Sequence, residues 1–147
     1  MFRQGFAAAC CLLLPILLAD PAGAEGQKVR IATEGAYAPF NYVTPDGQLA
    51  GFDVDIAKAV CAKEGLDCTI VAQDWDGIVP GLLAHKFDAI AASMSITEER
   101  KKRVDFSEKY YQTPARFVAR KGAQIEFTKE GLKGKVIGVQ RATIHAN

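Results

Sequence analysis

Residues 89–100 have the sequence AIAASMSITEER, and this stretch decides the fold class. Its small apolar beginning is typical of a buried strand. Thr97 suits the N-cap of a helix that begins with Glu98 and Glu99, because carboxylates stabilise the positive end of a helix. Hydroxyls, backbone N–H groups and the Arg100 guanidinium could together hold a carboxylate. The alternative is a capped surface helix with Arg100 in solvent.

Segments on both sides of this stretch alternate between strand and helix patterns, which predicts an α/β fold with a parallel sheet. Gly65 is expected to end the first helix, whose apolar stripe is Ile56, Ala57, Val60 and Cys61. The sequence TPDG at 44–47 predicts a turn between two extended segments. We expect strands at 28–33, 68–72, 87–92, 116–120 and 135–139, and helices at 53–64, 78–84, 126–131 and from 140 onward, with Pro80 near the start of its helix.

The first 24 residues have the pattern of a secretory signal peptide. Arg3 supplies the positive charge, residues 6–18 are apolar, and Ala22-Gly23-Ala24 resembles a cleavage site. An uncleaved anchor is the alternative. Export directed by this segment, followed by its removal, would place the mature chain outside the cytoplasm.

Charge and histidine content exclude several kinds of site. The chain has 18 Lys and Arg residues against 17 Asp and Glu residues, without the basic block that nucleic-acid binding favours. His85 and His145 lie far from the cysteines and show no metal-ligand spacing, so we expect no metal site and no cofactor.

Two cysteines, Cys61 and Cys68, remain after the first 24 residues. Export to an oxidising compartment favours a disulfide between them, and two buried thiols are the alternative. Such a bond would join the end of a helix to the start of the next strand.

Chemically active side chains follow the expected strands where each one ends. In open parallel sheets, ligands bind beyond the carboxyl ends of the strands. Arg100 could bind a carboxylate and Glu34 a cation, while two aromatic rings enclose an aliphatic body. The candidate residues that this edge would bring together are Glu34, Tyr37, Trp75, Ser93, Ser95 and Arg100.

From residue 28 to the end, the chain resembles periplasmic solute-binding proteins of polar amino-acid ABC transporters, of the lysine/arginine/ornithine- and histidine-binding type. The motifs that carry this resemblance are ATEGAYAPF at 32–40, GFDVDIAKAVC at 51–61, WDGIVPGL at 75–82, DAIAASMSITEER at 88–100 and LKGKVIGVQRAT at 132–143. The resemblance implies a type II periplasmic-binding-protein-like fold of two α/β lobes that close on the ligand. Residues 25–113 would form lobe one, and 114–147 would begin an incomplete lobe two.

The resemblance also implies roles for individual residues. Glu34 matches an aspartate that contacts a cationic side chain, Tyr37 and Trp75 match stacking aromatics, and Arg100 matches the carboxylate-binding arginine. Ser93 and Ser95 match ligand-contacting serines, Thr143 matches the carboxylate contact of lobe two, and Cys61 and Cys68 match a family disulfide. Two departures are Glu34 itself, which is longer by one methylene, and Ala92, where several relatives have serine. Because family members continue through lobe two, we expect the chain to be a truncated product or an incomplete record.

The function that this resemblance implies is non-enzymatic capture of a polar, basic L-amino acid in the periplasm. A monomeric binding protein would deliver it to an inner-membrane ABC permease. The alternatives are an enzyme that resembles the cyclohexadienyl dehydratases, the sensor lobe of a receptor, and a fragment without independent function.

Overall fold

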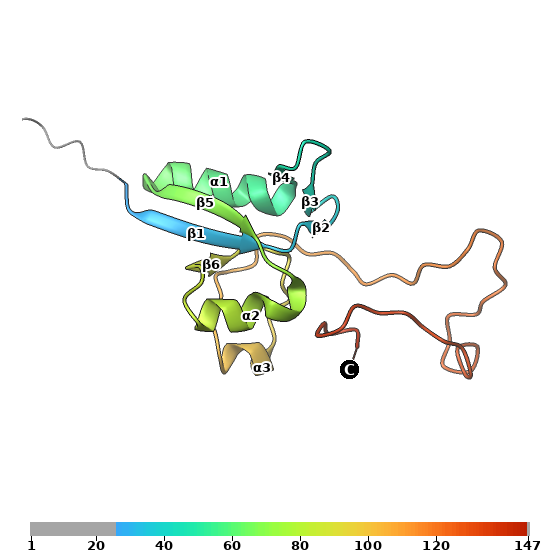
Figure 1. Cartoon of the computed structure of the whole chain (residues 1–147). Helices are drawn as coiled ribbons and strands as arrows, with labels where there is room; N and C mark the ends of the chain where they lie inside the picture. Colours follow the sequence, from blue (N-terminus) through green and yellow to red (C-terminus); the bar gives the residue numbers. More distant parts are fainter. Residues whose placement is uncertain (1–25, 147) are drawn as a thin grey trace, which may run out of the picture.

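The computed structural model describes residues 26–146, so the expected signal peptide lies outside the described residues. Strand β1 (Lys28–Thr33) is central, and parallel strands β5 (Asp67–Ala72) and β6 (Ala89–Ile90) lie on either side of it. Helices α1 (Phe52–Glu64) and α2 (Trp75–Leu83) cover opposite faces of this sheet (Figure 1). The parallel α/β prediction is therefore confirmed.

The alternation of β1 explains the two-sided core. Ile31 packs with Ala57 and Cys61 of α1, whereas its neighbour Ala32 packs with Ile78 of α2 on the other face. The predicted stripe of α1 is partly wrong, because Val60 is exposed and Asp53 and Val54 are fully buried. The helix faces the sheet with residues 53, 54, 57 and 61. It ends as predicted, with Gly65 in the left-handed conformation.

A second, antiparallel sheet contains β2 (Ala36–Tyr37), β3 (Asn41–Val43) and β4 (Leu49–Ala50). The predicted turn joins β3 to β4, and the Gly47 N–H donates to the Thr44 carbonyl at 2.9 Å. Gly51 follows β4 with a φ of 117°, where a Cβ atom would lie 2.5 Å from the Phe40 carbonyl oxygen. A glycine is therefore required where this hairpin leads into α1.

The second helix differs from its prediction. It begins at Trp75 rather than Ile78, and Pro80 is its sixth residue rather than one near its start. Proline has no N–H, so the Asp76 carbonyl loses its usual partner in the helix. The third predicted strand, 87–92, is reduced to β6, because the chain turns away at Ser93, which has a φ of 51°.

Beyond helix α3 (Glu98–Lys101), the predicted elements of lobe two are absent from the described chain. Residues 116–120 and 135–139 form no strand, and 126–131 and 140–143 form turns or irregular structure rather than helices. This part extends away from the sheet and returns toward α2 (Figure 1). Strands require hydrogen-bonded neighbours, and none of the described strands pairs with these residues.

The Cys61–Cys68 disulfide is confirmed, with the two Cα atoms 6.1 Å apart. It joins the last turn of α1 to β5, as the sequence predicted. Among residues 26–146, no helix is long and apolar enough to cross a membrane.

Candidate functional site

Arg100 is held by the local structure that the sequence predicted. The Thr97 hydroxyl accepts from the Arg100 backbone N–H at 3.2 Å, which caps α3. The guanidinium Nη1 donates to the Ser95 carbonyl at 2.7 Å, so the side chain turns back toward the strand end. Burial lowers the pKa of Arg100 because desolvation disfavours its charge. The side chain is thus fixed through Nη1, and Nη2 makes no contact within this loop.

Trp75 lies directly beside this arginine. The guanidinium carbon is 5.6 Å from the centre of the indole ring, within the range of a cation–π contact. Because α2 begins at Trp75, the ring is placed by the first turn of a helix rather than by a loop. The structure therefore brings Trp75, which follows β5, and Arg100, which follows β6, into contact.

A later part of the chain covers both groups. The Ala142 carbonyl accepts from Arg100 Nη2 at 2.9 Å and from Trp75 Nε1 at 3.2 Å. Gln140 Nε2 donates to Glu34 Oε1 at 2.6 Å, and Arg141 Nη2 pairs with Asp76 Oδ2 at 2.5 Å. Residues 140–142 therefore contact both a cationic side chain at the edge of the parallel sheet, Arg100, and two anionic ones, Glu34 and Asp76.

Thr143 does not reach this edge in the structure. Its hydroxyl donates to the Gln140 carbonyl at 2.8 Å and accepts from the His145 N–H at 3.3 Å. These are contacts within a local turn. A ligand contact through Thr143 stays a prediction.

Tyr37 lies on the short antiparallel sheet with its ring about half exposed. It stacks on Phe40 with ring centroids 5.1 Å apart, and Phe40 stacks on Tyr111 at 4.9 Å. The cluster supports one face of Tyr37 and leaves much of the ring open to solvent. Contact with a ligand through this ring stays a prediction.

Ser93 takes part in a buried network that sequence reasoning missed. Its hydroxyl donates to Asp53 Oδ2 at 2.7 Å, and Asn41 Nδ2 donates to the same oxygen at 2.8 Å. The Tyr110 hydroxyl donates to Asp53 Oδ1 at 2.7 Å. Asp53 has no exposed surface, so these donors replace the water that a carboxylate otherwise requires.

This network connects the two halves of the candidate site. The Gly35 N–H donates to Asn41 Oδ1 at 2.8 Å, which ties the backbone beside Glu34 to Asp53. Ser93 ties the loop before Arg100 to the same carboxylate. The signal in the sequence was the position of Asp53, four and eight residues before the apolar Ala57 and Cys61. A charged residue on the inner face of a helix is unusual and indicates a buried partner.

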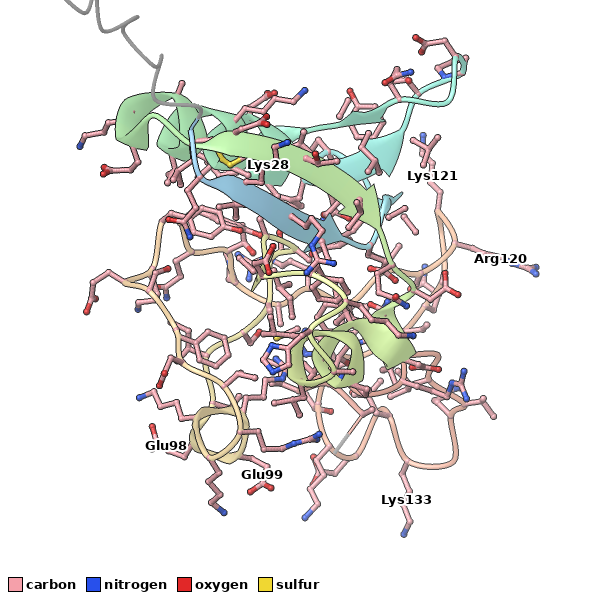
Figure 2. The ribbon with its side chains drawn as sticks, turned by 60° about the vertical axis from the view of Figure 1, so that its left-hand side comes forward. Lys28, Glu98, Glu99, Arg120, Lys121 and Lys133 are labelled. Carbon is pink, nitrogen blue, oxygen red and sulfur yellow. A yellow bond between two sulfur atoms is a disulfide. The ribbon has the colours of Figure 1, made fainter. Side chains whose placement is uncertain are left out.

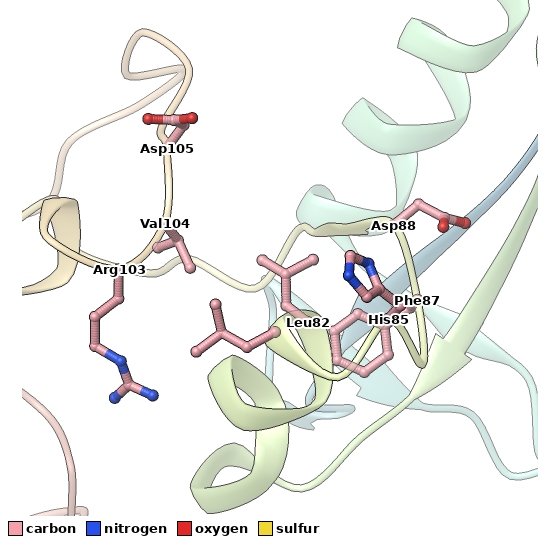
Figure 3. Close-up of a pocket in the computed structure, with 8 residues that line it drawn as sticks. Leu82, His85, Phe87, Asp88, Arg103, Val104 and Asp105 are labelled. Atoms are coloured by element: carbon pink, nitrogen blue, oxygen red, sulfur yellow. The ribbon is translucent and has the colours of Figure 1, made fainter.

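Charged side chains outside the site are exposed. Glu98 and Glu99 project from α3 away from the sheet (Figure 2), where they pair with Lys101 and Lys102 at 2.9 and 2.8 Å. A shallow hollow lies between the end of α2 and residues 103–105 (Figure 3). None of the expected site residues lines it. Within 26–146, no group of three or more His, Cys, Asp or Glu side chains could hold a metal ion.

Comparisons with known proteins place this chain in a family. An L-arginine-binding protein of Pseudomonas aeruginosa is 52% identical over 127 residues, which are 86% of this chain and 49% of that protein. A histidine-binding periplasmic protein of Escherichia coli is 43% identical over 117 residues, 80% of this chain and 45% of that one. The chain thus spans about half the length of these relatives.

A solved structure of the arginine-bound form of domain 1 from TmArgBP is similar, with a TM-score of 0.55 and 42% identity. The match covers 57% of this chain and 65% of that one, so one lobe of the type II periplasmic-binding fold is shared. The bacterial extracellular solute-binding proteins, family 3, match residues 29–142, and this chain is a member of that family.

Proposed function

We propose that this chain binds a polar L-amino acid with a cationic side chain at the edge formed by Arg100, Trp75 and Glu34. The observation that carries the proposal is the Arg100 guanidinium beside Trp75, anchored on Ser95 through Nη1, with Nη2 donating to a carbonyl oxygen, that of Ala142. A carboxylate is the ligand group that best suits such a nitrogen.

The remaining contacts follow from the chemistry of the side chains. The Glu34 carboxylate pairs with an ammonium or guanidinium, and Trp75 and Tyr37 enclose the aliphatic part of the ligand. Ser93 and Ser95 lie at the end of the site that receives the ligand carboxylate. Thr143 adds a further contact to this carboxylate after residues 140–142 move. The relatives named for L-arginine and histidine support a basic ligand.

The same family membership supports a transport role. We propose that the first 24 residues direct export, that the chain is a monomer in the periplasm, and that it delivers the amino acid to an inner-membrane ABC permease. It performs no covalent chemistry in this role. The periplasmic histidine-binding relative supports this location.

The test follows the fluorescence of Trp75, the single tryptophan of the chain. The chain, expressed with its own first 24 residues and purified from the periplasmic fraction, is titrated with L-arginine, L-lysine, L-ornithine, L-histidine and L-glutamine. We expect saturable changes that favour the basic amino acids and are lost in Arg100→Ala. A folded protein that responds to none of them contradicts the proposal.

Prephenate serves as the probe for the enzymatic alternative. A cyclohexadienyl dehydratase would convert it, and the change in ultraviolet absorbance would report the conversion. We expect no turnover, because a cation-binding Glu34 beside stacking aromatics does not supply a general acid above the ring of prephenate.

A further inference from the structure

We propose that residues 140–142 act as an internal competitor that occupies the amino-acid site of this chain. The inference rests on the proposed function, because it assigns each contact of the segment to a part of the ligand. The Ala142 carbonyl oxygen takes the place of a carboxylate oxygen, and the Gln140 amide takes the place of the side-chain cation. The site therefore selects ligands that replace both groups at once.

At the cationic end of the site, formed by Arg100 and Trp75, the segment takes the place of the ligand carboxylate. The Ala142 carbonyl lies 2.9 Å from Arg100 Nη2 and 3.2 Å from Trp75 Nε1, so one oxygen satisfies two donors. A neutral carbonyl bonds a guanidinium less strongly than a carboxylate does. An amino acid that brings its carboxylate to Arg100 thus replaces a weaker partner with a stronger one.

At the anionic end of the site, formed by Glu34, the segment takes the place of the ligand cation. Gln140 Nε2 donates to Glu34 Oε1 at 2.6 Å across 106 residues of sequence. A ligand with an ammonium or guanidinium replaces this neutral donor with a charged one. An amino acid with an apolar side chain would expel Gln140 and leave Glu34 without a protein partner at that oxygen. Competition by the segment therefore discriminates against apolar amino acids.

The backbone of the segment shows why it can be displaced. Ala142 has a φ of 54°, a left-handed conformation that is unfavourable for a residue with a Cβ atom. The contacts with Trp75 and Arg100, together with the exposed Arg141–Asp76 ion pair, hold this conformation. Exposed ion pairs contribute little, so the segment is held only modestly.

Two substitutions at residue 142 change the segment in opposite directions. Ala142→Pro fixes φ near −65°, which moves the carbonyl away from Arg100 and Trp75. Ala142→Gly removes the penalty for positive φ and strengthens the seated state. Ala119→Pro, in the exposed irregular part of the chain, is the matched control.

Two measurements separate the inference from the proposed function. The first is acrylamide quenching of Trp75 without ligand, which we expect to increase in Ala142→Pro and to stay unchanged in Ala119→Pro. The second is the Kd for L-arginine, which we expect to be about tenfold lower in Ala142→Pro, because two hydrogen bonds no longer compete. In Ala142→Gly we expect it to be about fivefold higher.

Each outcome bears on one of the two statements. Equal quenching and equal arginine affinity in all folded variants would overturn the internal competitor and leave the proposed function intact. Increased quenching in Ala142→Pro without arginine binding by any variant would support the seated segment and contradict the proposed function. Gln140→Ala removes the contact with Glu34 and leaves the Ala142–Arg100 contact in place. We expect this variant to bind L-arginine more tightly than the wild type.

Discussion

Single side chains in this protein take roles that their residue types alone do not reveal. Asp53 belongs to a helix with a strong sequence pattern, yet it is fully buried and accepts hydrogen bonds from Asn41, Ser93 and Tyr110. Those donors come from a strand, a loop and a distant segment. One carboxylate therefore fixes the positions of three parts of the chain around the candidate site.

We expect Tyr110→Phe to lower the free energy of unfolding by about 1–2 kcal/mol near neutral pH, because Asp53 loses one of its donors. Urea denaturation, followed by circular dichroism, measures this loss. Tyr42→Phe, on β3, is the matched control. Equal stability of Tyr110→Phe and the wild type would show that the Tyr110–Asp53 contact contributes nothing.

The same tyrosine predicts a pH dependence. Burial, followed by the hydrogen bond to Asp53, raises the pKa of Tyr110 well above its ordinary value near 10. The unfolded chain therefore releases this proton near pH 10 while the folded chain retains it. Its contribution to stability is complete below pH 10 and decreases as the pH rises above that value. We expect a shallower decrease in Tyr110→Phe, measured by denaturation between pH 8 and 11.

Arg100 predicts a loss of affinity that depends on geometry as well as charge. Arg100→Lys keeps the positive charge, but an ammonium cannot donate to Ser95 and to a ligand carboxylate in a planar fork. We expect a Kd for L-arginine that is at least about tenfold higher, measured by Trp75 fluorescence. An unchanged Kd would mean that charge alone accounts for the role of Arg100.

Helices and strands explain how these residues are positioned. The sheet order β5-β1-β6 places α1 and α2 on opposite faces, and the carboxyl ends of the strands lead to Glu34, Trp75 and Ser93. The disulfide joins α1 to β5 on one side only. The α1 side of the sheet is thus closed by a covalent bond, whereas the α2 side depends on packing around Ile78.

We expect Cys61→Ala with Cys68→Ala to lower the free energy of unfolding by about 2.5 kcal/mol, because a short closed loop no longer restricts the unfolded chain. Denaturation with and without dithiothreitol measures it. Reduction should destabilise the wild type by a similar amount and leave the double variant unchanged. A double variant that still responds to dithiothreitol would exclude this disulfide as the cause.

Across residues 26–146, a packed α/β part is followed by a long part without regular structure. Residues 112–120 and 135–140 form no helix or strand and expose apolar side chains such as Phe117, Val118 and Val136. Within the described residues, 140–142 return to the packed part through several hydrogen bonds. The stability of the chain is therefore unevenly distributed.

Hydrogen exchange measured by mass spectrometry should report this distribution. We expect slow exchange in β1 and β5, whose amides pair within the sheet, and fast exchange in 112–120 and 135–140. Slow exchange in these two ranges would instead indicate paired strands, as the sequence predicted for 116–120 and 135–139. The turn around 44–47, which is exposed but hydrogen-bonded, serves as an internal reference.

Features encoded by neighbouring residues could be predicted without coordinates. Strand β1 follows from its alternation, the extent of α1 from its helical pattern and Gly65, and the α3 cap from Thr97. The disulfide follows from export and from the two cysteines that remain after the first 24 residues. Each depends on interactions within a few residues or on one covalent bond. The same local rules placed the start of α2 three residues too late, because Trp75 and Pro80 are weak helix signals.

Other features depended on the path of the complete chain. No local pattern indicates that Tyr110 donates to Asp53 or that Ala142 contacts Trp75 and Arg100, because these partners are 57, 67 and 42 residues apart. Residues 116–120 and 135–139 have the composition of strands. A strand forms only where a neighbouring strand supplies hydrogen bonds, and these ranges pair with none of the described strands. Local propensity therefore determined the elements of the first lobe, whereas long-range packing decided which residues meet at the candidate site.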